Sequence, residues 1–237
     1  MRKVIVSLSG NVGKTTVSVQ LLAPRLPGEK IISVESINAD AATLGVDAER
    51  IKGERFDKII KELAIEDDLI IDVGASNADA FISRCASLEG QDEVDLWIIP
   101  VTPDQKILTD TARLVEILGD TMNVPGEKIV VLPNRTPIAA DDIVEELGPL
   151  VKFHAKNKGK FRLALEAAIP ENEAYSLAAR KGMTVDAIAK DETDYKAQAK
   201  AAGSDKDREK ALDMFALVKM AKAASRDLDR SFAALFN

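Results

Sequence analysis

Eight residues near the start of the chain constrain its fold more than any other stretch: Ser9-Gly10-Asn11-Val12-Gly13-Lys14-Thr15-Thr16. A hydrophobic run at 4–8 precedes them, and an apolar periodic segment at 17–22 follows. This order of strand, glycine-containing loop, Gly-Lys-Thr and helix is typical of a phosphate-binding loop, or P-loop. Glycines let successive backbone N–H groups face a phosphate, and the helix N-terminus adds free donors and a positive dipole end.

The residue types in this loop suit a nucleotide bound together with Mg²⁺. Lys14 places a positive charge at the outer phosphates, and Thr15 offers a hydroxyl to the metal. Asparagine tolerates left-handed backbone angles better than most residues, so Asn11 still allows the loop to form. We therefore predict a site built from Gly10, Asn11, Val12, Gly13, Lys14, Thr15 and Thr16; the alternative is a glycine-rich turn between a strand and a helix.

Strands and helices are expected to alternate along the first three quarters of the chain. Apolar runs predict strands at 4–8, 30–34, 68–74, 94–101, 128–132 and 163–168, and helical spacing predicts helices at 15–23, 54–64, 77–87, 104–118, 141–147 and 174–181. This alternation predicts an α/β fold: a mostly parallel twisted sheet with helices on both faces. Ligands bind beyond the carboxyl ends of strands in such sheets, and the candidate loops all lie there.

The composition changes near residue 191, where a charged, alanine-rich stretch begins. Apolar residues then recur at steps of three and four along 205–236, which predicts one long helix with a narrow apolar stripe. We expect a nucleotide-binding domain at 1–190 and a C-terminal helical extension at 191–237. The extension either packs on the domain or serves a contact with a partner or a second copy.

Asp72 ends an apolar strand, and Gly74 follows it closely. In P-loop proteins an acid at such a position holds Mg²⁺ and complements the P-loop hydroxyl, here that of Thr15. The alternative is a strand-end aspartate that caps the next helix. We also expect Glu35, Asn38 or Asp40, after the second strand, to orient an attacking water, with a solvated acidic turn as the alternative.

Asn134 follows the fifth predicted strand. Its amide carries both a donor and an acceptor, which suits the edge of adenine. The alternative is a turn residue between two prolines. A basic run comprises Lys152, Lys156, Lys158, Lys160 and Arg162 around His154; it is interpreted either as a contact to a nucleic-acid backbone or as a solvated surface loop.

Composition narrows the classes of function. The net charge of −7 argues against a whole-protein electrostatic grip on nucleic acid. With one cysteine, Cys85, no disulfide can form within the chain, which favours a reducing, cytoplasmic location. We expect Cys85 to be a buried helix residue. No apolar stretch approaches the roughly 18 residues of a membrane helix, so no membrane span is expected.

Taken in order, these motifs resemble the ParA/MinD family of deviant Walker-A P-loop ATPases over about residues 1 to 190. The resemblance rests on the P-loop, Leu69-Ile70-Ile71-Asp72, Ile99-Pro100-Val101-Thr102-Pro103, Val130-Val131-Leu132-Pro133-Asn134-Arg135 and Ala168-Ile169-Pro170-Glu171-Asn172. Within that family the chain looks like the StbB plasmid-stability proteins of conjugative plasmids. That closer resemblance rests on the P-loop followed by Leu-Leu-Ala-Pro-Arg-Leu at 21–26 and Val-Glu-Ser-Ile-Asn-Ala-Asp at 34–40.

The resemblance implies that Lys14 and Thr15 contact phosphates and Mg²⁺, that Asp72 serves the metal, and that Asn134 and the Ile169-Pro170 loop surround adenine. It also implies a nucleotide-dependent homodimer in which a signature lysine reaches the phosphates of the other subunit. Ser9 stands at the position of that lysine, and Ile37 replaces the aspartate that orients water, a role that Asn38 or Asp40 could take.

The leading hypothesis is therefore an ATP-binding ParA-like protein of plasmid stability, partition or conjugation. It would bind ATP or ADP with Mg²⁺ and hydrolyse ATP slowly or on stimulation by a DNA-bound protein partner. Catalytic roles are predicted for Lys14, Asp72, Asp40 and Asn38. One alternative is a non-hydrolysing nucleotide-binding adaptor that recruits such a partner; a small-molecule kinase or synthetase is another. Direct DNA contact and the preference for ATP over GTP stay open.

Overall fold

The structure is a computed structural model that describes residues 1–34, 47–52, 55–137 and 140–236. In chain order the elements are β1 (Arg2–Ile5), η1 (Thr16–Leu22), β2 (Lys30–Val34), β3 (Glu49–Ile51), α1 (Phe56–Ile65), β4 (Leu69–Val73), η4 (Ala75–Asn77), α2 (Ala78–Ser87), η5 (Gly90–Glu93), β5 (Leu96–Val101), α3 (Gln105–Glu116), η6 (Ile117–Thr121), η7 (Gly126–Lys128), β6 (Ile129–Thr136), α4 (Ala140–Glu146), α5 (Gly148–Lys156), β7 (Arg162–Leu163), η8 (Leu165–Ala167), β8 (Ile169–Pro170), α6 (Glu173–Arg180), α7 (Val185–Ala189), α8 (Tyr195–Ala201) and α9 (Asp205–Phe236).

The strands form a parallel sheet in the order β3-β2-β4-β1-β5-β6-β7, and β8 pairs with the end of β6. β1 lies at the centre, with Ile5 opposite Asp72 of β4 and opposite Ile98 of β5. The carboxyl ends of these three strands therefore meet at one edge of the sheet. This edge is where the P-loop leaves β1.

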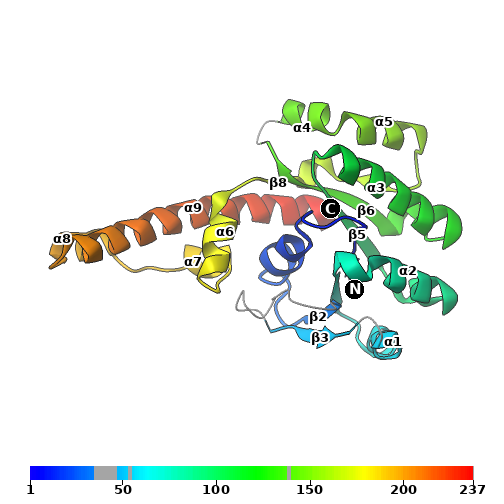
Figure 1. The fold of residues 1–237 in the computed structure, drawn as a ribbon, viewed down its shortest axis with the longest axis horizontal. Coiled ribbons are helices and arrows are strands. Elements are labelled where there is room, and N and C mark those ends of the chain that lie inside the picture. Colours follow the sequence, from blue (N-terminus) through cyan, green and yellow to red (C-terminus); the bar gives the residue numbers. More distant parts are fainter. Residues whose placement is uncertain (35–46, 53–54, 138–139, 237) are drawn as a thin grey trace.

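Helices cover both faces of the sheet (Figure 1). One buried cluster joins alternate strand residues, such as Val4 and Ile71, to α1, α2, α3, α4 and α5. A second cluster joins the intervening residues, such as Ile5 and Ile70, to η1, α6, α7 and α9. Side chains alternate between the two faces along a strand. Asp72 is two residues after Ile70, so it points to the same face, which η1 covers. The predicted fold class is confirmed.

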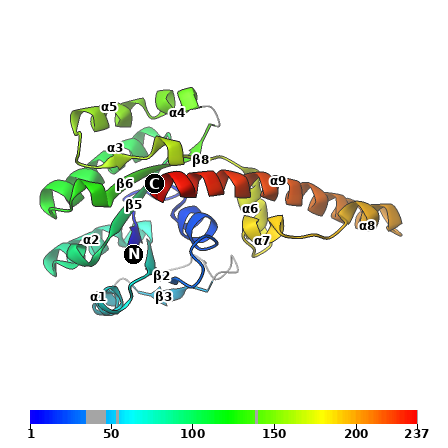
Figure 2. The same ribbon diagram turned by 180° about the vertical axis from the view of Figure 1, so that it is seen from behind.

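α9 is a single helix of 32 residues, which corresponds to a length of about 48 Å. Its later part packs on the second face through buried residues such as Leu217, Ala224 and Leu228. Its first turns extend away from the sheet together with α8, as both views of the molecule show (Figures 1 and 2). The predicted long helix is confirmed, and the division of the chain at residue 190 stays a prediction.

Three expectations about the elements are wrong. The strand predicted at 163–168 is two short strands, β7 and β8, separated by the turn η8. The fifth strand does not end at Leu132, because β8 pairs with its extension at Asn134 and Thr136. Much of the basic run is helical, because α5 turns apolar residues such as Leu150 toward the core. Neither β3 nor α5 was predicted.

Cys85 is buried in α2, as expected, and burial raises the pKa of its thiol to about 12.

Candidate nucleotide-binding site

The segment between β1 and η1 has the backbone shape of a P-loop. Asn11 and Gly13 both have positive φ angles, 58° and 83°. These angles lie in the left-handed region, which asparagine enters more readily than most residues and glycine enters without strain. A Cβ atom on Gly13 would lie 2.0 Å from Nδ2 of Asn134, so the loop is pressed directly against β6.

Asn134 is the contact that holds the loop in this position. Its Nδ2 donates to the backbone oxygen of Val12 over 2.8 Å, and the residue is only 2% exposed. Asn134 lies within β6 and not in a turn between two prolines, so that alternative is excluded. The side-chain amide of Asn134 thus donates to the P-loop backbone. A contact between Asn134 and adenine stays a prediction.

Lys14 lies inside the loop, with its Nζ donating to the backbone oxygen of Ser9 over 3.2 Å. The side chain is largely buried at 9% exposure. The ammonium group is therefore folded back toward the concave side of the loop, where the backbone of a P-loop faces phosphate.

Asp72 reaches the start of η1 from the neighbouring strand β4. Its Oδ2 accepts a hydrogen bond of 2.6 Å from Ser18 Oγ, and Asp72 is 6% exposed. Burial raises the pKa of Asp72, while Ser18, the positive charge of Lys14 and a hydrogen bond from Thr15 act in the opposite direction. The structure thus brings together Lys14, Thr15 and Asp72, which the sequence analysis singled out. Asp72 caps no helix in the contacts that the described residues make.

Ser18 was missed by the sequence analysis. It is 1% exposed and lies three residues after Thr15, one helical turn further along η1. Its spacing from Thr15 is the one signal that could have found it, because residues three apart share a helix face.

The carboxylate of Asp72 and the hydroxyls of Thr15 and Ser18 are hard oxygen donors. Mg²⁺ prefers such donors when substrate phosphates complete its coordination. The residues present therefore fit the predicted metal.

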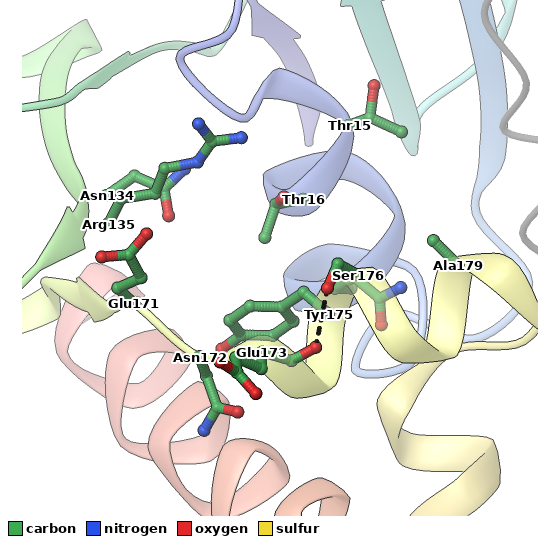
Figure 3. Close-up of a pocket in the computed structure, with 11 residues that line it drawn as sticks. Thr15, Thr16, Asn134, Arg135, Glu171, Asn172, Glu173, Tyr175, Ser176 and Ala179 are labelled. Atoms are coloured by element: carbon green, nitrogen blue, oxygen red, sulfur yellow. Dashed lines mark hydrogen bonds between the residues drawn. The ribbon is translucent and has the colours of Figure 1, made fainter. Parts of the chain in front are cut away.

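A cavity of about 710 Å³ opens beside the loop. It is lined by Thr15, Thr16 and Gln20 of the P-loop helix, Asn134 and Arg135 of β6, and Glu171, Asn172, Glu173, Tyr175, Ser176 and Ala179 (Figure 3). The volume suits a ligand of nucleotide size. Pro170 ends β8 immediately before Glu171, so the predicted Ile169-Pro170 loop delivers the chain to the cavity.

Tyr175 is a lining residue that the sequence analysis did not identify. It lines the same cavity as Thr16 (Figure 3), and burial raises the pKa of its hydroxyl. The hydroxyl oxygen is buried and finds no hydrogen-bond partner among the residues that the structure describes. A buried polar atom without a partner is costly, so it is a candidate ligand contact.

The far end of η1 is fixed to α7 and α9. The amide of Ala23 bonds to the oxygen of Ser18, five residues back, so this helix is wider than an α-helix. Beyond it, Arg25 donates to the backbone oxygens of Gln20 and Leu21 and pairs with Asp186 of α7. Arg25 also bonds Ser225 O and Asp229 of α9.

Two members of the basic run have structural partners. Lys160 pairs with Asp120, and Arg162 donates to the backbone oxygens of Ala234 and Leu235 at the end of α9. His154 packs edge-on against Phe161 at 4.9 Å between ring centres. Lys152, Lys156 and Lys158 are exposed, so these three are the members left for any contact with nucleic acid.

The predicted water-orienting residues Glu35, Asn38 and Asp40 lie outside the described residues. Within the part that the structure describes, no cluster of three or more histidine, cysteine, aspartate or glutamate side chains could hold a metal by itself. The described helices also include none with the length and apolar character required to cross a bilayer.

No family model and no curated protein matches this sequence. Solved structures match the fold. An ATP complex of a McdA variant from Cyanothece aligns over 100% of this chain and 96% of its own, with a TM-score of 0.56 and 15% identity. The cell division ATPase MinD from Pyrococcus furiosus aligns over 96% of this chain and 98% of its own, with a TM-score of 0.54 and 19% identity.

The sheet order and the P-loop geometry define the fold of a P-loop NTPase. Both similar structures narrow this to the ParA/MinD-type fold, with a long C-terminal helix. At these identities the likeness concerns the fold alone.

Proposed function

We propose that this chain binds ATP together with Mg²⁺ at the P-loop. The observation that carries the proposal is the meeting of Lys14, Thr15 and Asp72 at the start of η1, where Thr15 also lines the cavity of about 710 Å³. A buried lysine and a buried carboxylate at the start of one helix suit a phosphate with its metal. The similarity to a structure solved with ATP supports the choice of nucleotide.

Each residue has a separate role in this proposal. Lys14 holds the outer phosphates, and the backbone amides of the loop from Gly10 to Thr16 surround them. Thr15 and Asp72 hold Mg²⁺, with Ser18 keeping the Asp72 carboxylate in place. The metal would supply charge neutralisation at the phosphates. Asn134 fixes the loop through Val12, and the residues after Pro170 line the space for the base.

The biological role that we propose rests on the resemblance to StbB-like proteins: plasmid stability, partition or maintenance of a conjugative plasmid. ATP would be hydrolysed slowly or on stimulation by a DNA-bound protein partner, with a nucleotide-dependent homodimer as the working form. Asn38 and Asp40 are the proposed residues for orienting water. A location in the cytoplasm follows from this role and stays a prediction.

The test is ATP affinity with Mg²⁺, measured by isothermal titration for the native chain and for Lys14→Ala. We expect the substitution to weaken binding at least about a hundredfold, because a buried charge-assisted contact is lost. Lys158→Ala is the control, because Lys158 is an exposed residue just after α5 and does not line the cavity; this variant should bind ATP as the native chain does. Equal affinities for the native chain and Lys14→Ala would disprove the proposal.

Phosphate release from the same samples separates the two forms of the proposal. Turnover that Lys14→Ala abolishes indicates an ATPase. Binding without turnover favours the adaptor, in which the nucleotide holds a shape that a partner recognises. Light scattering with and without nucleotide reports whether a homodimer forms.

A further inference from the structure

A chain of polar contacts joins the P-loop to α3. Ser9 Oγ donates to Oδ2 of Asp110 over 2.5 Å, and Lys106 Nζ donates to the same oxygen over 2.6 Å. The cavity described above is lined by η1, β6, α6 and the segment before α6, so this contact lies on a different flank of the loop. The shared oxygen places the Lys106 ammonium group close to the Ser9 hydroxyl.

The contact also leads directly to Lys14. The backbone oxygen of Ser9 accepts the bond from Lys14 Nζ, while the Ser9 side chain bonds Asp110. Ser9 is itself fixed, at 4% exposure, with its amide donating to Ser7 Oγ. One rigid residue thus lies between the buried lysine of the loop and the cation on α3.

Lys106 differs from Ser9 in its freedom to move. Its side chain is 76% exposed, and its pairing with Asp110 is an exposed pair one helical turn apart, a kind of ion pair that contributes little stability. Its backbone is held, because Asp104 caps α3 by accepting from the amides of Lys106 and Ile107. The ammonium group can therefore move over a short range from a fixed point.

The charges of Asp110 and Lys106 bear on how the loop would receive an anion. Lys106 and Ser9 hold the pKa of Asp110 below its usual range, so the carboxylate is ionised beside a loop shaped for anions. An uncompensated carboxylate there would repel a triphosphate more strongly than a diphosphate, because the triphosphate carries more charge. A lysine on that same carboxylate removes the repulsion and can itself reach an anion.

We propose that Lys106 contacts the terminal phosphate of a nucleotide bound at the P-loop, while Asp110 tethers it to Ser9. This inference rests on the proposed function. It assigns to α3 the recognition of the terminal phosphate and thereby makes Lys106 a residue that distinguishes a triphosphate from a diphosphate.

The test compares the affinities for a non-hydrolysable ATP analogue and for ADP, both with Mg²⁺, in the native full chain and in Lys106→Ala. We expect the substitution to weaken binding of the analogue roughly tenfold, the effect of one hydrogen bond to a charged group, and to change ADP affinity less than about twofold. Lys106→Arg should retain most of the native preference. Lys160→Ala, which breaks an exposed lysine–aspartate pair beyond α3, should change neither affinity.

Asp110→Asn combined with Lys106→Ala separates contact from simple neutralisation. If Lys106 touches the phosphate, the double variant stays weak for the analogue. Recovery of native affinity in the double variant would overturn the proposal, because Lys106 would then act only by neutralising Asp110. Equal losses for the analogue and ADP, or no loss at all, would overturn it as well. A native chain that binds neither nucleotide would overturn the proposed function together with this inference.

Discussion

η1 meets charged groups at both of its ends, and the two ends differ in how those groups are paired. At the first end Asp72 is buried with hydroxyl donors and with Lys14 nearby, and the backbone at Asn11 and Gly13 is left-handed. At the second end Arg25 is bonded to backbone oxygens and to carboxylates of α7 and α9.

This difference separates the part of the helix that we propose as a ligand site from the part that fixes the helix in the fold. Asp72 and Lys14 at the first end bond hydroxyl and backbone groups of the loop and η1, whereas Arg25 at the second end pairs with carboxylates of other helices. The following substitutions test that distinction, beginning with the largest expected effect.

Gly13→Ala should lower the free energy of unfolding by about 4 kcal/mol, because it combines a strained positive φ with a clash in a packed site. The added Cβ would meet Asn134 Nδ2 at 2.0 Å. Urea denaturation measures the loss, and nucleotide binding should disappear with it. The control is Gly119→Ala, whose Cβ would have no atom within 4 Å and should leave both properties near native. A native-like Gly13→Ala protein would show that the loop can move away from β6.

Arg25→Ala should lower the free energy of unfolding by roughly 3 kcal/mol, because removal of one partner leaves Asp186 poorly solvated and without its cation. Arg25 and Asp186 are 9% and 13% exposed. Denaturation of Arg230→Ala is the comparison, because that residue pairs with Asp227 while 61% exposed and should change stability by less than about 0.5 kcal/mol. Similar small losses in both variants would mean that the second end of η1 is not held by its charges.

Asp72→Asn should raise the free energy of unfolding by about 1 kcal/mol in the absence of nucleotide, since it removes a buried charge and keeps an oxygen for Ser18. The same change should remove the dependence of ATP affinity on Mg²⁺. Asp79→Asn, at an exposed position on α2, should change neither property. Destabilisation by Asp72→Asn would mean that the carboxylate is well compensated without a ligand.

The stabilisation expected from Asp72→Asn should depend on pH. Burial raises the pKa of Asp72, so the folded chain binds this proton more tightly than the unfolded chain does. Stability from this group therefore falls as pH rises from the unfolded value of 3.8 through the folded one. The advantage of Asp72→Asn should grow as pH rises above 3.8 and should vanish on acidification toward 3.8, as denaturation at several pH values would show.

The first end of η1 was largely predictable from sequence, and the second end was not. Gly-Lys-Thr after an apolar strand is a local pattern, and the acid of β4 ends an apolar run, so both appear without knowledge of the fold. Arg25, in contrast, bonds Asp186 and Ser225, which are 161 and 200 residues away in the chain. No local pattern indicates such partners.

The errors in the strands have the same origin. β6 extends to Thr136 only because β8 lies beside it, and β8 exists only because η8 interrupts the run at 163–168. Each depends on pairing between segments that are distant in sequence, which composition and periodicity do not report. α5 was not predicted because its lysines were interpreted as part of a charged surface run. In the structure Leu150 and Val151 of the same helix pack on the core.

The contact between Asn134 and the loop also sets an order of events during folding. The bond from Asn134 to Val12 joins residues 122 positions apart, and β6 reaches β1 only through β5. Closing so long a loop costs conformational entropy, and only the contacts of the assembled sheet offset that cost. The P-loop precedes β6 in the chain, so the contact that fixes the shape of the loop forms only after β6 has been synthesised and has joined the sheet. The geometry of the P-loop therefore depends on the completed centre of the sheet.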